Sequence, residues 1–122
     1  MKIGLLGLAL ISAPLTAEEF VAQTAPMAGH WMVDLRPSAD SPPYSKPMDI
    51  SIAADGRVTG SFYNSDIIAG RAGRGRGRLC LAFRTSDGQG LYHSSACLID
   101  GKMVGQTWAE DRNFIFPWTA ER

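Results

Sequence analysis

The chain has 122 residues, and its 12 lysines and arginines balance 12 aspartates and glutamates, so its formal net charge is zero. This balance argues against a protein dedicated to nucleic acid, which carries an excess of basic charge. A chain of this length forms one domain with a modest hydrophobic core, so a covalent cross-link would help to stabilise it.

The N-terminus has the layout of a secretory signal peptide. Lys2 precedes an uncharged apolar run over residues 3–11, and the segment ends in small residues at Ala17. The run is shorter than the roughly 20 residues of a membrane-spanning helix. We therefore expect a signal peptide over residues 1–17 and a periplasmic or secreted protein with no transmembrane segment in the mature chain. An uncleaved N-terminal anchor is the alternative.

The mature chain predicts a flexible leader over residues 18–30, where Pro26 and Gly29 interrupt helical structure, and a single β domain over residues 31–122. In this domain glycine and proline separate short apolar segments at the spacing of an all-β protein. The expected strands are Trp31–Leu35, Met48–Ile52, Arg57–Tyr63, Ile67–Arg71, Gly77–Thr85, Leu91–Ile99, Lys102–Trp108 and Asn113–Ala120. Because consecutive hairpins form a meander, and closure removes its free edges, we predict an eight-stranded antiparallel up-and-down β-barrel with little or no helix.

Two turns fix the register of the strands that they join. A type I turn with Gly56 in the left-handed position gathers apolar side chains on one face. It places Met48, Ile50 and Ile52 opposite Phe62, Gly60 and Val58. A two-residue turn at Asp100-Gly101 leaves Trp108 on the outer face, where it would indicate a partner surface.

The long proline-rich loop over residues 36–47 has a length typical of functional or mobile loops.

The two cysteines, Cys80 and Cys97, are expected to form a disulfide. An exported chain meets an oxidising compartment, where an even number of cysteines favours pairing. A two-residue hairpin loop at Gly88-Gln89 would place Cys80 opposite Cys97 on neighbouring strands. Free thiols or a metal site are the alternatives. The two histidines, His30 and His93, stand at no ligand spacing, so we predict no metal.

The sequence AGRAGRGRGRL, residues 69–79, is here called the arginine–glycine tract. An RNA-binding segment is not expected in an exported chain, and the spacing fits neither a phosphate loop nor a dinucleotide loop. Instead, glycine and arginine alternate with the period of a strand, which places Leu79, Leu81 and Phe83 inside and the arginines outside. The outer face is either merely solvated or an anion or partner surface. That surface would consist of Arg74, Arg76, Arg78, Arg84 and His93, with His93 opposite Arg84.

The chain offers few groups for catalysis. The motifs G-x-S-x-G and H-E-x-x-H are missing, and both cysteines are used in the expected disulfide. Glu110 and Asp111 are adjacent in a polar turn, where their side chains need not converge. We therefore expect a protein that is not an enzyme, with no catalytic residue and no cofactor.

The inward positions of the expected strands carry many aromatic side chains. With a few hydroxyl groups they would form a small apolar pocket, or they would simply fill the barrel, because eight strands allow either arrangement. The candidate ligand-binding residues are Trp31, Phe62, Phe83, Tyr92, Phe116 and Trp118.

This pattern resembles the calycin-type barrels, the group of lipocalins and avidin-like proteins. Gly29-His30-Trp31 matches the G-x-W opening of their first strand, and residues 56–63 look like the strand that follows in avidin-like chains. The resemblance implies a small ligand-binding β-barrel with a basic residue, Arg112 or Arg122, packed over the first tryptophan. The T-D-Y turn of lipocalins is missing, and the biotin contacts of avidins cannot be placed. An exported barrel with one disulfide is also similar to small periplasmic protease inhibitors.

Two functions fit these observations. The first is a small exported, non-enzymatic binding protein that holds a small apolar or amphipathic ligand in the barrel mouth. The second is a protein-binding module, such as a periplasmic protease inhibitor or an envelope-interaction protein. It would use the arginine positions, the leader and the 36–47 loop. Neither function involves nucleic acid.

Overall fold

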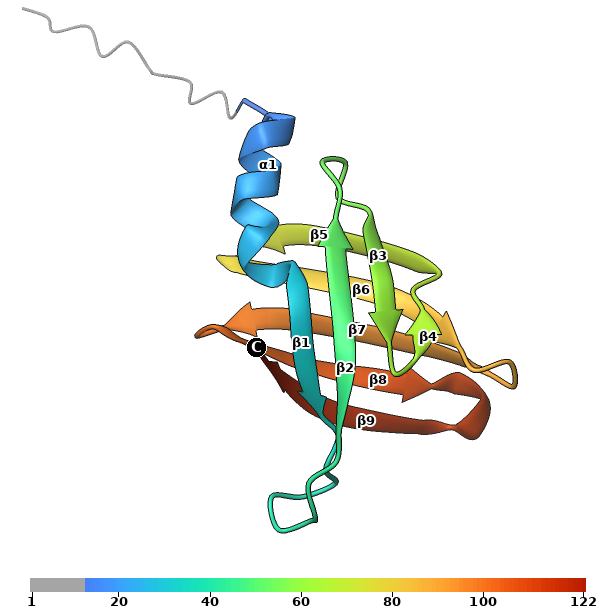
Figure 1. The fold of residues 1–122 in the computed structure, drawn as a ribbon. Coiled ribbons are helices and arrows are strands. Elements are labelled where there is room, and N and C mark those ends of the chain that lie inside the picture. Colours follow the sequence, from blue (N-terminus) through green and yellow to red (C-terminus); the bar gives the residue numbers. More distant parts are fainter. Residues whose placement is uncertain (1–12) are drawn as a thin grey trace, which may run out of the picture.

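The computed structural model describes residues 13–122, so residues 1–12 of the predicted signal peptide lie outside the described part. Within residues 13–122 the chain forms one nine-stranded antiparallel sheet with one short α-helix (Figure 1). The helical elements are α1 (Ala17–Thr24) and the 3₁₀ helices η1 (Ala25–Met27) and η2 (Glu110–Arg112). The strands are β1 (Gly29–Asp34), β2 (Ser45–Ile52), β3 (Val58–Phe62), β4 (Ser65–Asp66), β5 (Ala69–Gly75), β6 (Arg78–Ser86), β7 (Leu91–Ile99), β8 (Lys102–Ala109) and β9 (Phe114–Glu121).

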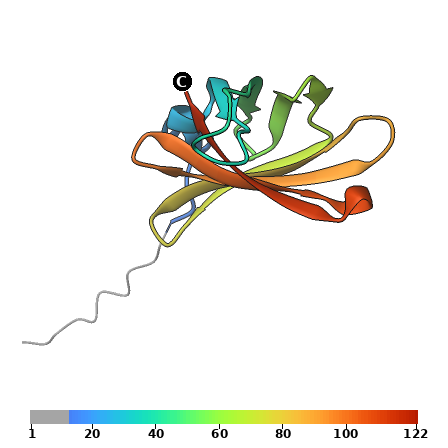
Figure 2. The ribbon, with the colours of Figure 1, turned by 90° about the horizontal axis from the view of Figure 1, so that it is seen from below.

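The sheet is curled into a half-barrel. Its strand order is β4-β3-β2-β1-β9-β8-β7-β6-β5, so the chain runs up and down between neighbours and the first strand pairs with the last. Figure 2 shows β1–β4 lying over a layer formed by β5–β9. The predicted all-β antiparallel meander is confirmed, but the described residues form nine strands rather than eight.

The additional strand, β4, arises from a tight turn that follows β3. Tyr63 and Asn64 both have positive φ angles, 53° and 63°, as in a two-residue hairpin turn of type I′. The chain therefore reverses at once, and Ser65 and Asp66 pair with the end of β3. The sequence predicted only a turn here, because a polar run carries no strand pattern.

The ladder of the sheet is interrupted between β4 and β5. The segment just before β3 approaches β5 at one seam, where the backbone N–H of Ala72 donates to the carbonyl oxygen of Gly56 at 2.8 Å. Arg57 and Arg71 form an isolated antiparallel bridge at the same place. The half-barrel is therefore pinned at this seam by a few backbone contacts and not by a continuous pair of strands.

The strand registers that the turns predicted are confirmed. Met48, Ile50 and Ile52 lie opposite Phe62, Gly60 and Val58. Cys80 lies opposite Cys97, and their sulfur atoms are 1.98 Å apart in a disulfide. β7 and β8 pair across the two-residue turn at Asp100-Gly101, so Trp108 lies on the outer face.

The arginine–glycine tract is a hairpin and not a single strand. Arg76 and Gly77 lie between β5 and β6 and have φ angles of 53° and 75°, which again form a type I′ turn. Arg74 is paired with the inward-facing Leu79, whereas Arg78 faces outward. The prediction that the three arginines share one outer face is therefore wrong. The alternation of glycine and arginine continues through the turn and conceals it.

The segment 18–30, expected to be a flexible leader, contains α1 and η1. The hydroxyl of Thr16 caps α1 by accepting the backbone N–H of Glu19 at 3.1 Å, and two glutamates in the first turn favour the start of the helix. Pro26 stops the helix after eight residues, and η1 then brings Met27 into the core. Within residues 13–122, every helix is too short to cross a membrane.

The space between the two layers is filled by side chains. The ring of Phe62 lies 5.6 Å from that of Phe83 and 5.5 Å from that of Trp118, measured between centroids. Trp31 is fully buried beside them in the same cluster. The rest of the buried hydrophobic cluster consists of Met27, Val33, Met48, Ile50, Val58, Ile67, Ala72, Leu79, Leu81, Ala96, Met103 and Ala120.

Arg122 packs over Trp31 at the end of β9. Its guanidinium carbon lies 4.4 Å from the centroid of the Trp31 ring, and its Nη2 donates to the carbonyl oxygens of Pro26 (2.6 Å) and Ala28 (2.8 Å). This is the contact that the calycin resemblance implied for a basic residue near the last strand. Arg112, the other candidate, lies in η2.

Replacing Arg122 with alanine is expected to lower the free energy of unfolding by about 1–2 kcal/mol, since it removes a cation–π contact and two hydrogen bonds. Arg122→Lys should restore only part of the loss, because an ammonium group cannot stack on the ring and donate as a planar fork. Urea unfolding of the three proteins measures the effect. A loss below about 0.3 kcal/mol for the alanine variant would mean that the contact does not hold the N-terminal segment.

Candidate binding surfaces

The six candidate ligand-binding residues fall into two groups. Trp31, Phe62, Phe83 and Trp118 are each 5% exposed or less, and they pack inside the half-barrel. Tyr92 and Phe116 are half-buried and lie nearer to the end of the half-barrel that carries η2. The alternation along the strands therefore identified aromatic residues that face inward, but four of the six candidates pack in the hydrophobic core of this structure.

A polar network tied to Asp87 lies at the η2 end of the half-barrel. One carboxylate oxygen of Asp87 accepts the backbone N–H groups of Gln89 and Gly90, both at 2.9 Å. The other oxygen accepts the hydroxyl of Tyr92 at 2.7 Å and lies 3.5 Å from Nη2 of Arg112. The hydrogen bond from Tyr92 is the main reason why the pKa of Asp87 is lowered, and the same bond raises the pKa of Tyr92.

This network predicts a pH dependence of stability. Because folding lowers the pKa of Asp87, the ionised carboxylate stabilises the folded state above its unfolded pKa of about 3.9, and this contribution is lost as the pH falls through the lower folded value. We expect the wild type to lose stability more steeply than Asp87→Asn below about pH 4. Thermal unfolding across the acidic range measures the difference, and parallel profiles would contradict the prediction.

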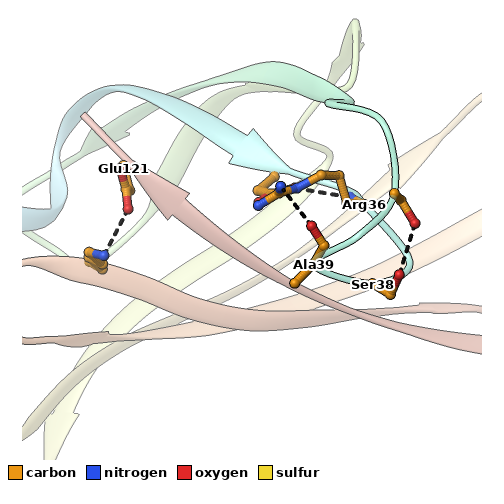
Figure 3. Close-up of polar contacts among 7 residues, drawn as sticks. Arg36, Ser38, Ala39 and Glu121 are labelled. Atoms are coloured by element: carbon orange, nitrogen blue, oxygen red, sulfur yellow. Dashed lines mark hydrogen bonds and ion pairs between the residues drawn. The ribbon is translucent and has the colours of Figure 1, made fainter.

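The 36–47 loop is shorter than expected and is held by internal contacts (Figure 3). β2 already begins at Ser45, so the loop spans residues 35–44. Arg36 binds the carboxylate of Asp34, with Nη2 and Oδ2 2.6 Å apart, and its hydrogen bonds lower the pKa of Asp34. Ser38 and Ser41 join their hydroxyl groups at 3.0 Å. A surface hollow beside the loop is lined by Pro37, Ser41, Pro42, Pro43, Tyr44, Ser45 and Lys46.

The same loop is tied to the turn after β3 by two tyrosines. The hydroxyl groups of Tyr44 and Tyr63 form a hydrogen bond, and this bond is the main cause of the raised pKa of Tyr63. The ammonium nitrogen of Lys46 lies 5.8 Å from the centroid of the Tyr44 ring and 5.4 Å from that of Tyr63. The loop is therefore anchored to the neighbouring turn.

The outer face of β7, β8 and β9 carries an exposed apolar row. Trp108 is 43% exposed and Ile115 is 61% exposed, and the two residues are opposite each other on β8 and β9. Pro117 is exposed two residues further along β9. We call Trp108, Ile115 and Pro117 the apolar row. A hollow at this row is lined by His93, Ser94, Ser95, Gln106, Trp108 and Ile115.

His93 lies between the apolar row and the arginines of β5 and β6. Its ring centroid is 5.2 Å from that of Trp108, and its Nε2 is 3.4 Å from a carboxylate oxygen of Glu110. Arg84 lies opposite His93 on β6, as the sequence predicted. None of the five arginines on β5, the following turn and β6 belongs to an ion pair among residues 13–122. These are Arg71, Arg74, Arg76, Arg78 and Arg84.

The sequence identified Trp108 and missed the residues that accompany it. Ile115 and Pro117 were available from the alternation along the expected strand Asn113–Ala120. Phe116 and Trp118 face inward, so the residues that precede them must face outward. Phe114 has the inward parity but is exposed, since it lies at the end of β9 beyond the core.

The arrangement of titratable groups provides little for covalent chemistry. His30 is exposed on β1 and lies 2.8 Å from a carboxylate oxygen of Asp49, while His93 contacts Glu110. Both cysteines are in the disulfide. Within residues 13–122 no three side chains gather as ligands for a metal ion.

No protein-family model, curated protein or solved structure matches the chain.

Proposed function

We propose that this chain is a small exported binding protein without catalytic activity, and that it binds a protein partner. The observation that carries this proposal is the distribution of its aromatic side chains. The rings inside the half-barrel contact one another, whereas Trp108 and Ile115 leave apolar surface exposed on the outside. Exposed aromatic residues beside polar groups are typical of protein interfaces.

The proposed location outside the cytoplasm is supported by two features. The N-terminal sequence has the layout of a signal peptide. The structure contains a cross-strand disulfide, a bond that persists in oxidising compartments. The fold also supports a calycin-type relationship for the domain, because Arg122 packs over the tryptophan of Gly29-His30-Trp31.

A small apolar or amphipathic ligand at the η2 end is the second candidate function. Tyr92 and Phe116 are only half-buried there, and Phe114 is exposed beside them. A ligand at this end would rest on the packed rings below and contact these three side chains. It would be bound in a shallow mouth and not in a deep cavity.

The two candidates are separated by comparing Trp108→Ala with Phe116→Ala in protein secreted to the periplasm. If the partner is a protein, Trp108→Ala should lose capture of the partner that the wild type retains and should keep wild-type stability, because it truncates an exposed side chain. Phe116→Ala should retain capture. Native mass spectrometry gives the contrary outcome: a small-molecule mass increment that Phe116→Ala removes would support the second candidate instead.

A further inference from the structure

The outer face of β6–β9 aligns four side chains in one cross-strand row. Arg84 lies opposite His93, His93 opposite Trp108, and Trp108 opposite Ile115. With neighbouring strands about 4.8 Å apart, the row extends about 14 Å across the sheet. It begins with a cation and ends with exposed apolar side chains. A second row beside it has the same polarity and runs through Arg71, Ala82, Ser95, Gln106 and Pro117.

Neither cation at the beginning of these rows belongs to an ion pair in the described chain. The hydrogen bond from the backbone N–H of Arg57 is the main cause of the lowered pKa of Asp55, and the charge of the nearby Arg71 contributes to it. Arg84 is exposed and belongs to no ion pair within residues 13–122, and Arg71 contacts only the backbone oxygen of Asp55 through its guanidinium group. An unpaired guanidinium group is a strong, planar donor for carboxylates. The face is therefore complementary to a surface that is acidic at one end and apolar at the other.

We propose that this face binds an acidic segment of a partner protein that also carries a large apolar side chain. The apolar side chain would lie in the hollow between Trp108 and Ile115, which Gln106 and Ser95 border with hydrogen-bonding groups. The carboxylates of the segment would pair with Arg84 and, further along, Arg71. This inference rests on the proposed function, because it specifies the chemistry of the partner that the apolar row binds.

A protein segment fits this face better than an anionic membrane does. Glu110 lies beside His93 next to the apolar end of the row, and its carboxylate would repel a uniformly anionic surface at the place where Trp108 would have to insert. A protein segment can place its carboxylates on the arginines alone and leave the region near Glu110 uncharged. The polarity of the row therefore favours a partner whose charge is confined to one end.

The three tryptophans provide a direct measurement. The indole N–H of Trp31 donates to the carbonyl oxygen of Met27 and that of Trp118 to the hydroxyl of Thr107, both at 2.9 Å and both buried. Trp108 is the exposed tryptophan. In an NMR titration of the secreted protein, binding at the outer face should shift the indole signal of Trp108 and leave the other two unchanged. These two signals also report whether each variant is folded.

The probe is a synthetic peptide with glutamates in one half and phenylalanine and leucine in the other, and the control peptide has lysine at each glutamate. We expect only the acidic peptide to shift the Trp108 signal. Arg84→Glu should weaken binding of the acidic peptide more than about tenfold. Trp108→Ala should weaken it by a similar factor; because this variant lacks the indole signal, its binding is followed on the backbone amides of β8 and β9. Arg76→Glu is the matched control, because it lies in the β5–β6 turn about 20 Å along the hairpin from Arg84.

Three results of the peptide titration would overturn the inference. They are no binding of the acidic peptide, equal binding of the lysine peptide, and equal weakening by Arg76→Glu and Arg84→Glu. Binding of vesicles containing anionic lipid that depends on Arg84 and Trp108, without binding of the peptide, would also overturn it in favour of a membrane. The proposed function is judged separately by partner capture. If Trp108→Ala abolishes capture but Arg84→Glu does not, the proposed function stands and the acidic partner fails.

Discussion

Replacing Trp31 with alanine is expected to lower the free energy of unfolding by about 3–5 kcal/mol. Trp31 is 0% exposed, so truncation leaves a large cavity in the middle of the core. The change also removes the ring under the Arg122 guanidinium group and the hydrogen bond to the carbonyl oxygen of Met27. A domain of this size has about 5–15 kcal/mol of stability in total, so this loss removes a large part of it.

The measurement is equilibrium unfolding in urea, followed by circular dichroism. Trp31→Phe is the control, because it keeps most of the ring and removes the N–H group. It should cost about 1–3 kcal/mol, mainly because the buried carbonyl oxygen of Met27 loses its donor. If Trp31→Ala cost less than Arg122→Ala, the ring would not be the centre of the core, and the packing described above would be incorrect.

The registers were predictable because they depend on local turn chemistry. Gly56, Asp100-Gly101 and Gly88-Gln89 each fix how many residues the turn uses, and alternation then assigns every side chain to a face. For this reason the pairing of Cys80 with Cys97 and the outward position of Trp108 were both available from the sequence. A turn closes over a few residues, so no long-range information was needed.

The hairpin in the arginine–glycine tract could not be predicted in the same way. Alternation reveals a strand by its apolar side chains, and residues 73–78 contain none. Both Arg76 and Gly77 adopt positive φ, which is common for glycine but uncommon for arginine. The turn is set by the pairing of β5 with β6, where Ala72 lies opposite Leu81. That pairing is a tertiary contact and leaves no local signal.

The choice between a hollow and a filled interior was also beyond the sequence. Parity identifies which aromatic side chains face inward, but it does not give the distances between opposite walls of the sheet. The rings of Phe62 and Trp118 come from β3 and β9, which are not neighbours in the sheet, yet they lie 5.5 Å apart. The curl of the sheet determines this distance, and the curl depends on all nine strands.

Removing the disulfide is the second change with a large expected effect. The cross-link joins Cys80 and Cys97 across β6 and β7 with a sequence separation of 17. Closing a loop of this length stabilises a protein by about 3 kcal/mol in the chain-entropy model. We expect the double variant Cys80→Ser with Cys97→Ser to melt more than about 10 °C below the oxidised protein.

The same pair lies on the outer face in the cross-strand row next to the one that contains Ser95, so the variant also tests whether the binding surface depends on the cross-link. Cys97 lies opposite Val104 on β8, two residues along β7 from Ser95. The β6–β7 ladder begins at the cysteines and continues to Ser86 and Leu91, and the β7–β8 ladder is paired on both sides of Cys97. Because these ladders are long, the face should keep its shape once the protein is folded. The reduced wild type and the double variant should therefore melt together, and both should still respond to the acidic peptide at temperatures well below melting.

A double variant as stable as the oxidised wild type would show that the hairpin closes this loop in the unfolded chain without the bond. Loss of the Trp108 response in a folded double variant would show instead that the disulfide sets the geometry of the outer face.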